Sequence, residues 1–477
     1  MKMHDEKLIK NIKALIIFFT LIFLTIIGYL IYFNLYLSEN IVKDPSNPRI
    51  RLSEEDVIRG SIMDRNGKTI AFSKKVKNNQ VRIYNDGEVF AHVVGYNSPV
   101  YGKTGIELLY NDALQGNTFY YNILGSIFRK FVQTIEGEKR GSDVILTLDY
   151  ELQKKAYRLL KDNKGALVVL NPKTGEILAL VSKPSFDPEK VDKNFKVYKN
   201  DEMGNPFLNR AIQGYYPPGS TFKIVTLSAA LENFNGIENK SFLCTGKLKI
   251  GDYILKDFNS EAHGRINLKK AFSKSCNFTF GSLGIELGYN NLLKEAEKFM
   301  FNKEINLEDL KLGKCQFNIE DKENKALLAQ AAIGQHGVAT NPLHMALVAA
   351  TIANDGIMMK PYLVKEIKDE YGVVLYEKEP EILKRVIDKE IAKKVKEYMK
   401  DVVDKGTGVR AKLYNVDIAG KTGTAQLPNT DKTHAWFVGF APLKDPKIAF
   451  AIIVEEGGTG GKKAAEIAKE IVKECLK

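Results

Sequence analysis

One serine is followed three residues later by a lysine, in a context that suits nucleophilic chemistry. Ser220 and Lys223 come directly after the chain break at Pro217–Gly219, where an apolar run begins that favours a buried helix. Residues three apart share one face of a helix, so the lysine amine can lie beside the serine hydroxyl. A serine needs a base to become a nucleophile, and a lysine kept neutral by its surroundings can be that base. No other serine in the sequence has a lysine at this spacing.

Two further motifs follow in order along the chain. Ser275–Asn277 reads Ser-x-Asn, and Lys421–Gly423 reads Lys-Thr-Gly. Similar triplets occur elsewhere, but their context is wrong. Ser38–Asn40 lies where a hydrophobic segment ends, and the triplets at Lys103–Gly105 and Lys173–Gly175 both precede Ser220. The last of these lies between two apolar runs and is typical of a hairpin turn.

A run of 20 residues without a charge, Ala14–Phe33, is long enough to cross a bilayer as a helix. Four lysines precede it, against two acidic residues, which predicts a cytoplasmic N-terminus and an exported remainder. A cleaved signal peptide is the competing interpretation. No small-residue cleavage site follows in Phe33–Leu37, which favours a retained anchor.

The composition is that of a globular protein large enough for two or three domains. The chain has 477 residues, of which 44% are hydrophobic and 27% charged, and its net charge is +12. The positive charge is spread over scattered lysines, without a stripe of basic and aromatic residues. We therefore expect a solvated basic surface, suited to an anionic membrane or wall polymer, and no nucleic-acid binding.

The cysteines and histidines do not show the short spacings of a metal site. The even number of cysteines permits disulfides, but their spacing is irregular and no Cys-x-x-Cys occurs. The six histidines form no His-Glu-x-x-His or similar pattern. Cys276 lies inside the Ser-x-Asn motif, where we expect a small buried filler rather than a nucleophile. The sequence therefore predicts no metal and no cofactor.

Strands are expected near both ends of the catalytic region, with helices between them. The middle of this region, from 220 to about 353, is rich in helix, and residues 462–476 favour a closing amphipathic helix. The strand-like runs are 144–148, 165–170, 176–181, 416–424, 435–441 and 448–454. This order predicts an α+β fold in which an antiparallel sheet packs against a helical cluster. Asn66-Gly67 predicts a hairpin before it. The expected segments are a cytoplasmic tail (1–13), a transmembrane helix (14–36), a non-catalytic N-terminal domain (37–141) and a catalytic domain (142–477).

From the anchor to the C-terminus, the chain resembles the class B penicillin-binding proteins, which are monofunctional peptidoglycan D,D-transpeptidases. The ordered Ser-x-x-Lys, Ser-x-Asn and Lys-Thr-Gly motifs carry this resemblance. Further stretches similar to the family are 59–67, 105–107, 209–211, 216–223, 263–266, 334–338 and 420–426. The short N-terminal region is similar to that of the compact A-type members. The implied fold is a penicillin-binding-protein/β-lactamase-like transpeptidase domain behind a small, mostly β N-terminal domain and one membrane helix.

The resemblance also implies roles for the motif residues. Ser220 is expected to attack the carbonyl of D-alanyl-D-alanine, giving an acyl-enzyme and releasing D-alanine. Lys223 would take the serine proton, with the nearby charge of Lys421 helping to keep it neutral. Ser275 would relay a proton to the leaving amine. These four residues form the expected catalytic set.

A second set is expected to bind the substrate. Asn277 would orient the amide of the donor peptide, and Thr422, with Lys421, would bind the carboxylate of the substrate or of a β-lactam. Gly423 and Thr424 complete this set, and the N–H groups of Ser220 and Thr424 would form an oxyanion hole.

The implied partners are peptidoglycan stem peptides, β-lactams and a polytopic membrane glycan polymerase. The polymerase is expected because the short N-terminal region leaves no room for a glycosyltransferase domain in this chain.

Three alternative functions share parts of this sequence pattern. A β-lactamase would have the same three motifs and a deacylating base, a membrane-bound β-lactam sensor would have several membrane spans, and a wall-synthesis scaffold would have lost its catalytic motifs.

Overall fold

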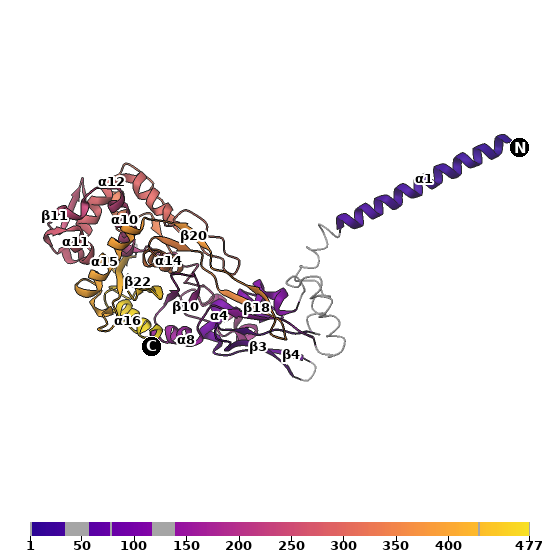
Figure 1. Cartoon of the computed structure of the whole chain (residues 1–477), viewed down its shortest axis with the longest axis horizontal. Helices are drawn as coiled ribbons and strands as arrows, with labels where there is room; N and C mark the ends of the chain where they lie inside the picture. The colour runs from indigo at the N-terminus through magenta and orange to yellow at the C-terminus, as the bar shows by residue number, and fades with distance from the viewer. Residues whose placement is uncertain (1, 34–56, 77–78, 117–138, 428–429, 477) are drawn as a thin grey trace.

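A five-stranded antiparallel sheet is the centre of the catalytic part of the molecule. The computed structural model describes residues 2–33, 57–76, 79–116, 139–427 and 430–476 (Figure 1). The strands follow the order β10 (Ile177–Lys183), β9 (Gly165–Leu170), β23 (Ile448–Val454), β22 (Thr433–Ala441) and β21 (Ala419–Gln426). Strands from both ends of the catalytic region thus pair with one another, as the sequence predicts.

The two faces of this sheet are covered by different helices. α14 (Pro342–Ala353) packs on one face and is buried along its whole length, because its residues are apolar on every side. α8 (Tyr150–Leu159) and α16 (Lys463–Cys475) cover the other face. Alternate residues of β23 separate the two cores: Ala449, Ala451 and Ile453 belong to the α14 side, and Phe450, Ile452 and Val454 to the α16 side.

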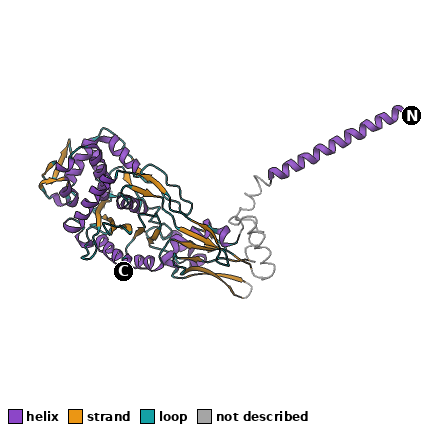
Figure 2. Cartoon of the chain, viewed as in Figure 1, coloured by secondary structure: helices purple, strands orange, loops and turns teal. Residues whose placement is uncertain are grey.

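A cluster of further helices lies at the end of the body farthest from the N-terminus (Figure 2). It contains α10 (Lys223–Asn233), α11 (Leu268–Ser273), α12 (Asn277–Lys298), α13 (Lys325–Ala332) and α15 (Lys389–Lys405). α12 packs against α10 and α13, whereas α15 packs against α11 and the edge strand β21. The predicted arrangement of a sheet against a helical cluster is confirmed.

A second, six-stranded sheet joins the N-terminal region to the catalytic part. Its strand order is β19 (Val374–Glu377), β18 (Val364–Lys368), β8 (Asp143–Leu146), β2 (Ile62–Met63), β3 (Thr69–Val76) and β4 (Asn79–Tyr84). The predicted hairpin at Asn66-Gly67 connects β2 to β3. The sheet contains strands from both sides of the boundary expected at 141/142, so the two regions share backbone hydrogen bonds. In Figure 1 this sheet and the helices α11 and α12 lie at opposite ends of the body.

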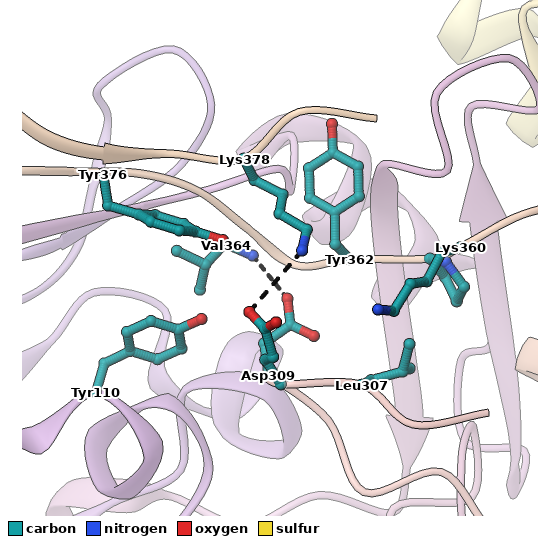
Figure 3. A pocket seen from close by; sticks show the side chains of 10 residues that line it. Tyr110, Leu307, Asp309, Lys360, Tyr362, Val364, Tyr376 and Lys378 are labelled. Carbon is teal, nitrogen blue, oxygen red and sulfur yellow. Dashed lines mark hydrogen bonds and ion pairs between the residues drawn. The ribbon is translucent and has the colours of Figure 1, made fainter. Parts of the chain in front are cut away.

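A small pocket marks the contact between the N-terminal helices and the six-stranded sheet (Figure 3). Tyr110, at the end of α5 (Gly105–Leu109), lies on one side of it, and Val364 and Lys378 lie on the other. One carboxylate oxygen of Asp309 accepts the N–H of Val364 at 3.0 Å. The pocket contains none of the predicted site residues and is therefore a structural contact between the two regions.

Two motifs of the N-terminal region meet in a buried charge cluster. Nε of Arg59 donates to Oε2 of Glu107 at 2.6 Å, and Nε of Arg82 donates to Oε1 at 2.7 Å. The side chain of Glu107 is fully buried. Burial opposes its ionised form, but the charges of Arg82 and Arg59 outweigh burial and lower the pKa of Glu107. The stretches at 59–67 and 105–107 therefore hold each other in place.

Changing Glu107 to glutamine should strongly destabilise this region. The substitution leaves two buried guanidinium groups without a counter-charge, which costs about 3–5 kcal/mol in the free energy of unfolding. Glu151→Gln is the control, because its ion pair with Lys68 is exposed and is worth at most about 1 kcal/mol. Because the folded-state pKa of Glu107 is low, the stabilisation should be full at neutral pH and lost on strong acidification. Calorimetric melting of both variants tests this; equal losses of Tm would contradict it.

The first helix, α1 (Lys2–Tyr32), contains a segment able to cross a membrane by length and composition. The most apolar stretch is Asn11–Leu30, with a mean hydropathy of 2.3 and no buried residue. This segment overlaps the predicted Ala14–Phe33 run. Residues 34–36 of the expected 14–36 span lie outside the described residues.

Candidate active site

Ser220 lies on a short 3₁₀ turn, η4 (Gly219–Phe222), that leads directly into α10, as predicted for a helix start. Gly219 has a φ of +54°, and a Cβ added there would lie 2.7 Å from the carbonyl oxygen of Thr424. Its N–H donates to the carbonyl of Gly334 at 2.8 Å. A side chain at this position would push the turn away from β21, so glycine is required for Ser220 to lie against that strand.

Lys223 is fully buried and contacts the second motif. Its Nζ donates to the carbonyl of Ser275 and to Oδ1 of Asn277, both at 2.7 Å, and lies 3.4 Å from Oγ of Ser275. In the described parts of the chain, no hydrogen bond joins Oγ of Ser220 to Lys223. Catalytic hydrogen bonds of free enzymes often form only when the substrate binds.

Ser275 lies in the junction between α11 and α12, with a left-handed φ of 58°. Its N–H donates to the carbonyl of Phe272 at 3.0 Å, and Cys276 is the N-cap of α12. Nζ of Lys421, which extends from β21, donates to Oγ of Ser275 at 2.8 Å and to the carbonyl of Thr422 at 3.0 Å. The Ser275 hydroxyl therefore lies between the two lysines, as a proton relay requires.

Burial lowers the pKa of both lysines. It brings the pKa of Lys223 to about 8, against the opposing influence of Cys276 and Asp257. The pKa of Lys421 lies well below its usual value, first because of burial and second because of the charge on Lys223. The predicted repulsion between the lysines is present, but burial is the larger cause. The ring centroids of Phe280 and Phe272 lie 5.5 Å from the ammonium groups of Lys223 and Lys421, respectively.

The third motif lies on β21, at the edge of the sheet. A Cβ added to Gly423 would lie 2.9 Å from the carbonyl of Pro218, so this glycine allows η4 to pack against the strand. Oγ1 of Thr422 lies 2.5 Å from Oγ1 of Thr407, which orients it. The carbonyl of Thr424 accepts the side chain of Gln335 at 3.4 Å. Thr422, Gly423 and Thr424 thus lie beside the turn that carries Ser220.

The two triplets that resemble the third motif lie elsewhere in the structure, away from the candidate site. Lys173–Gly175 forms the turn between β9 and β10, as predicted. Lys103–Gly105 lies at the start of α5 in the N-terminal region. Ser38–Asn40 lies outside the described residues.

The segment before the nucleophile is held by a polar network. Nε of Arg210 donates to Oε1 of Glu455 at 2.8 Å, and the hydroxyl of Tyr216 donates to the same oxygen at 2.6 Å. The indole N–H of Trp436 donates to the carbonyl of Pro217 at 3.2 Å. The predicted approach motif at 209–211 is thus tied to the end of β23, and Pro217 is tied to β22.

Several contributing residues could not be found from motif spacing. Asp257 accepts the backbone N–H of Asn277, and Thr407 and Gln335 contact the third motif. Cys244, Asp257, His263 and Cys276 form a cluster beside the Ser275–Asn277 segment that could hold a metal ion. Their spacing in the sequence is long, so a search for short ligand motifs misses them.

Comparisons with known proteins agree with this site. Residues 165–473 match the penicillin binding protein transpeptidase domain, and residues 59–144 match the penicillin binding protein A dimerisation domain. The chain is similar to the peptidoglycan D,D-transpeptidase PbpA of Mycolicibacterium smegmatis, with 32% identity over 472 residues that cover 93% of this chain and 94% of the relative.

Solved structures give the same result. Penicillin-binding protein A from M. tuberculosis in its ceftriaxone acyl-enzyme complex has a TM-score of 0.84 and 31% identity, covering 89% of this chain and 100% of the other. The penicillin G acyl-enzyme complex of the same protein has a TM-score of 0.82 and 30% identity, covering 88% of this chain and 100% of the other. This chain belongs to the penicillin-binding protein transpeptidase family. The predicted fold class and enzyme class, a serine acyl transferase, are confirmed.

The rate of acylation should depend on pH through Lys223. Only the neutral amine can accept the serine proton, and its fraction rises as the pH rises through the lowered pKa of about 8. The second-order rate constant for a fluorescent penicillin should therefore increase about tenfold per pH unit below this value and level off above it. A rate that is flat between pH 6 and pH 9 would contradict the assignment of the base.

Proposed function

We propose that this chain is a membrane-anchored peptidoglycan D,D-transpeptidase with Ser220 as its nucleophile. The observation that carries the proposal is that Ser275 is bonded by both lysines: its carbonyl accepts Lys223 and its hydroxyl accepts Lys421. This contact joins three motifs that are far apart in the sequence. The PbpA relative and the β-lactam acyl-enzyme structures support the same activity.

Acylation follows from this arrangement. Oγ of Ser220 attacks the carbonyl between the two D-alanines, and the neutral amine of Lys223 takes the proton. The Ser275 hydroxyl passes a proton to the amine of the departing D-alanine, so the peptide bond breaks and an ester forms. The N–H groups of Ser220 and Thr424 stabilise the oxyanion, and one such donor is worth ~10²–10³ in rate.

Substrate binding uses the remaining motif residues. The carboxylate of the terminal D-alanine pairs with Lys421 and Thr422, and its negative charge favours the protonated form of Lys421. Asn277, whose Nδ2 donates to the carbonyl of Lys256 at 2.9 Å in the free enzyme, orients the peptide amide. Gly423 contributes by letting η4, and with it Ser220, lie close to β21 beside the bound substrate. An amine from a neighbouring stem peptide then attacks the ester and completes the crosslink.

The lifetime of the acyl-enzyme distinguishes a transpeptidase from a β-lactamase. A transpeptidase awaits an amine and excludes water, so its penicilloyl adduct should persist long after excess penicillin is removed. The decay of a fluorescent penicillin adduct and the turnover of a chromogenic cephalosporin measure this directly. Many turnovers per enzyme molecule would instead favour the membrane-anchored β-lactamase, and Ser220→Ala gives the background in both assays.

The anchor sets the location of the reaction. α1 is proposed to span the membrane over 14–36, with residues 1–13 in the cytoplasm and residues 37–141 and 142–477 outside, as a non-catalytic and a catalytic domain. The lysine-rich flank before Ala14 supports this orientation. A reporter active only outside the cytoplasm, fused after Lys477, should give activity. Activity of a cytoplasmic reporter alone would contradict the orientation.

A glycan polymerase is the partner that the reaction requires, because crosslinking acts on newly made strands. We infer that a polytopic membrane polymerase contacts α1 and the region 51–141. Exchanging Ala14–Phe33 for an unrelated membrane helix should weaken co-purification and complementation. The region 51–141 is exchanged in the same way. If co-purification and complementation both survive each of the two exchanges, the partner proposal fails.

A further inference from the structure

Four side chains converge beside the second motif from separate elements. Cys244 ends β11 (Ser241–Cys244), and Asp257 follows β13 (Tyr253–Lys256). His263 precedes β14 (Gly264–Asn267), and Cys276 caps α12. One potential ligand atom from each lies within 4.8 Å of all the others. Cys244, Asp257 and Cys276 are buried, and only 8% of the His263 side chain is exposed.

The spacing of these atoms matches a tetrahedral ion. Zinc bonds of about 2.0–2.3 Å place ligand atoms roughly 3.3–3.8 Å apart. Oδ2 of Asp257 lies 3.1 Å from Sγ of Cys244, 3.5 Å from Sγ of Cys276 and 3.8 Å from Nδ1 of His263. Sγ of Cys244 lies 3.4 Å from Nδ1 of His263. Four of the six separations are therefore close to those around a tetrahedral ion, and the other two are at most 4.8 Å.

Both sulfur atoms also accept backbone N–H groups. Sγ of Cys244 accepts from Gly246 at 3.4 Å, and Sγ of Cys276 accepts from Thr279 at 3.3 Å. The second sulfur lies at the N-terminus of α12, where Cys276 is the N-cap residue. Such bonds stabilise thiolate ligands and orient them toward a metal.

The surrounding segment packs only one side against the helices, where Phe242, Leu255 and Ile266 are buried. Residues 241–267 form two separate two-stranded ribbons, β11 with β14 and β12 (Lys247–Ile250) with β13, near the α11 and α12 end of the body in Figure 1. Their outer residues Leu243, Ile254 and Phe258 are exposed. A two-stranded ribbon is marginally stable alone, and small modules of this kind use metals or disulfides as crosslinks.

We propose that Cys244, Asp257, His263 and Cys276 bind a structural zinc ion. Two thiolates and an imidazole select zinc over magnesium or calcium, and four protein ligands make a closed site. The thiols bind as thiolates and release their protons to solvent. A Cys244–Cys276 disulfide is the alternative, but it would leave the buried carboxylate and imidazole without the ion that both can ligate. The four ligands have no short spacing along the chain, so only the folded structure brings them together.

The ion would also support the catalytic segment. Cys276 lies between Ser275 and Asn277, and the second oxygen of Asp257 accepts the backbone N–H of Asn277. Oδ1 of Asn277 in turn accepts Lys223. Metal binding thus fixes the position of the second motif relative to the base. This link rests on the proposed function, whereas the metal site itself does not.

Elemental analysis of the full-length protein, purified without chelators, tests the site. We expect about one zinc per chain in the wild type and in Cys475→Ser, which removes a thiol outside the cluster. Zinc should fall to background in Cys244→Ser and His263→Ala and be retained in Cys244→His, which keeps a ligand. Undiminished zinc in Cys244→Ser, or a metal-free wild type with a Cys244–Cys276 disulfide in non-reduced peptide maps, would overturn the proposal.

Two measurements on the wild-type chain avoid variants that fail to fold. Cobalt loaded after chelation should give the thiolate charge-transfer band and intense visible bands of a tetrahedral site, and their absence would overturn the proposal. Chelation should also slow labelling by fluorescent penicillin about tenfold, with recovery on adding zinc. Labelling that is independent of chelation contradicts the link to the second motif; absence of labelling in the zinc-loaded protein instead contradicts the proposed function.

Discussion

Replacing Ser220 with alanine should abolish covalent labelling by a fluorescent penicillin. Ser220 lies on η4, which packs against β21, and its hydroxyl is the proposed nucleophile. Removing the nucleophile of a serine enzyme lowers the rate by about 10⁶-fold, which is complete loss on the timescale of labelling. The N–H groups and lysines that bind the β-lactam remain, so reversible binding can continue without an adduct.

Ser282→Ala is the matched control. This half-buried serine lies on α12, and its hydroxyl donates to the helix's own backbone at Phe278, at 2.8 Å, and not to a motif side chain. Its removal should leave labelling within about twofold of the wild type, because loss of such a local bond has a small effect. Mass mapping of the wild-type adduct should place the label on the peptide that contains Ser220. Undiminished labelling of Ser220→Ala would show that another residue is the nucleophile.

Replacing Lys223 with methionine should produce the second largest loss. Methionine fills a similar volume without an amine, so the proton acceptor is lost while the buried position stays occupied. The loss of a positioned general base slows acylation by ~10²–10⁴. The chain should stay folded, since removing a fully buried amine relieves its desolvation and offsets the hydrogen bonds lost at Ser275 and Asn277.

Lys240→Met tests whether the effect is specific. Lys240 forms a half-exposed ion pair with Glu286, so its removal should leave the acylation rate and its pH dependence unchanged. The residual rate of Lys223→Met should no longer rise through the lowered pKa of about 8. Acylation of Lys223→Met within a few-fold of the wild type would exclude Lys223 as the base.

Local sequence patterns predicted the parts of the site that are local. The Pro217–Gly219 break and the spacing of Ser220 and Lys223 predicted the turn and the start of α10, because both depend on neighbouring residues. The third motif was predicted on a strand at 416–424, and β21 extends over Ala419–Gln426. The roles of individual motif residues came from the family resemblance and remain predictions.

Long-range contacts were the parts that sequence patterns could not supply. β18 and β19 were not predicted, because β18 pairs with β8, more than 200 residues earlier in the chain, and β19 pairs with β18. The cluster of Cys244, Asp257, His263 and Cys276 depends on two ribbons that lie within a region predicted to be mainly helical. Burial of Lys421 depends on packing among β21, α11 and α15, which no local pattern shows.

Crosslinking of peptidoglycan by the purified full-length chain tests the central claim most directly. The enzyme is incubated with glycan strands carrying pentapeptide stems, and the digested products are separated and weighed. We predict dimeric muropeptides joined through a new peptide bond and one D-alanine released per crosslink, with neither product from Ser220→Ala. Crosslinks formed equally by Ser220→Ala, or D-alanine released from the wild type with no dimers in the presence of acceptor stems, would contradict the account.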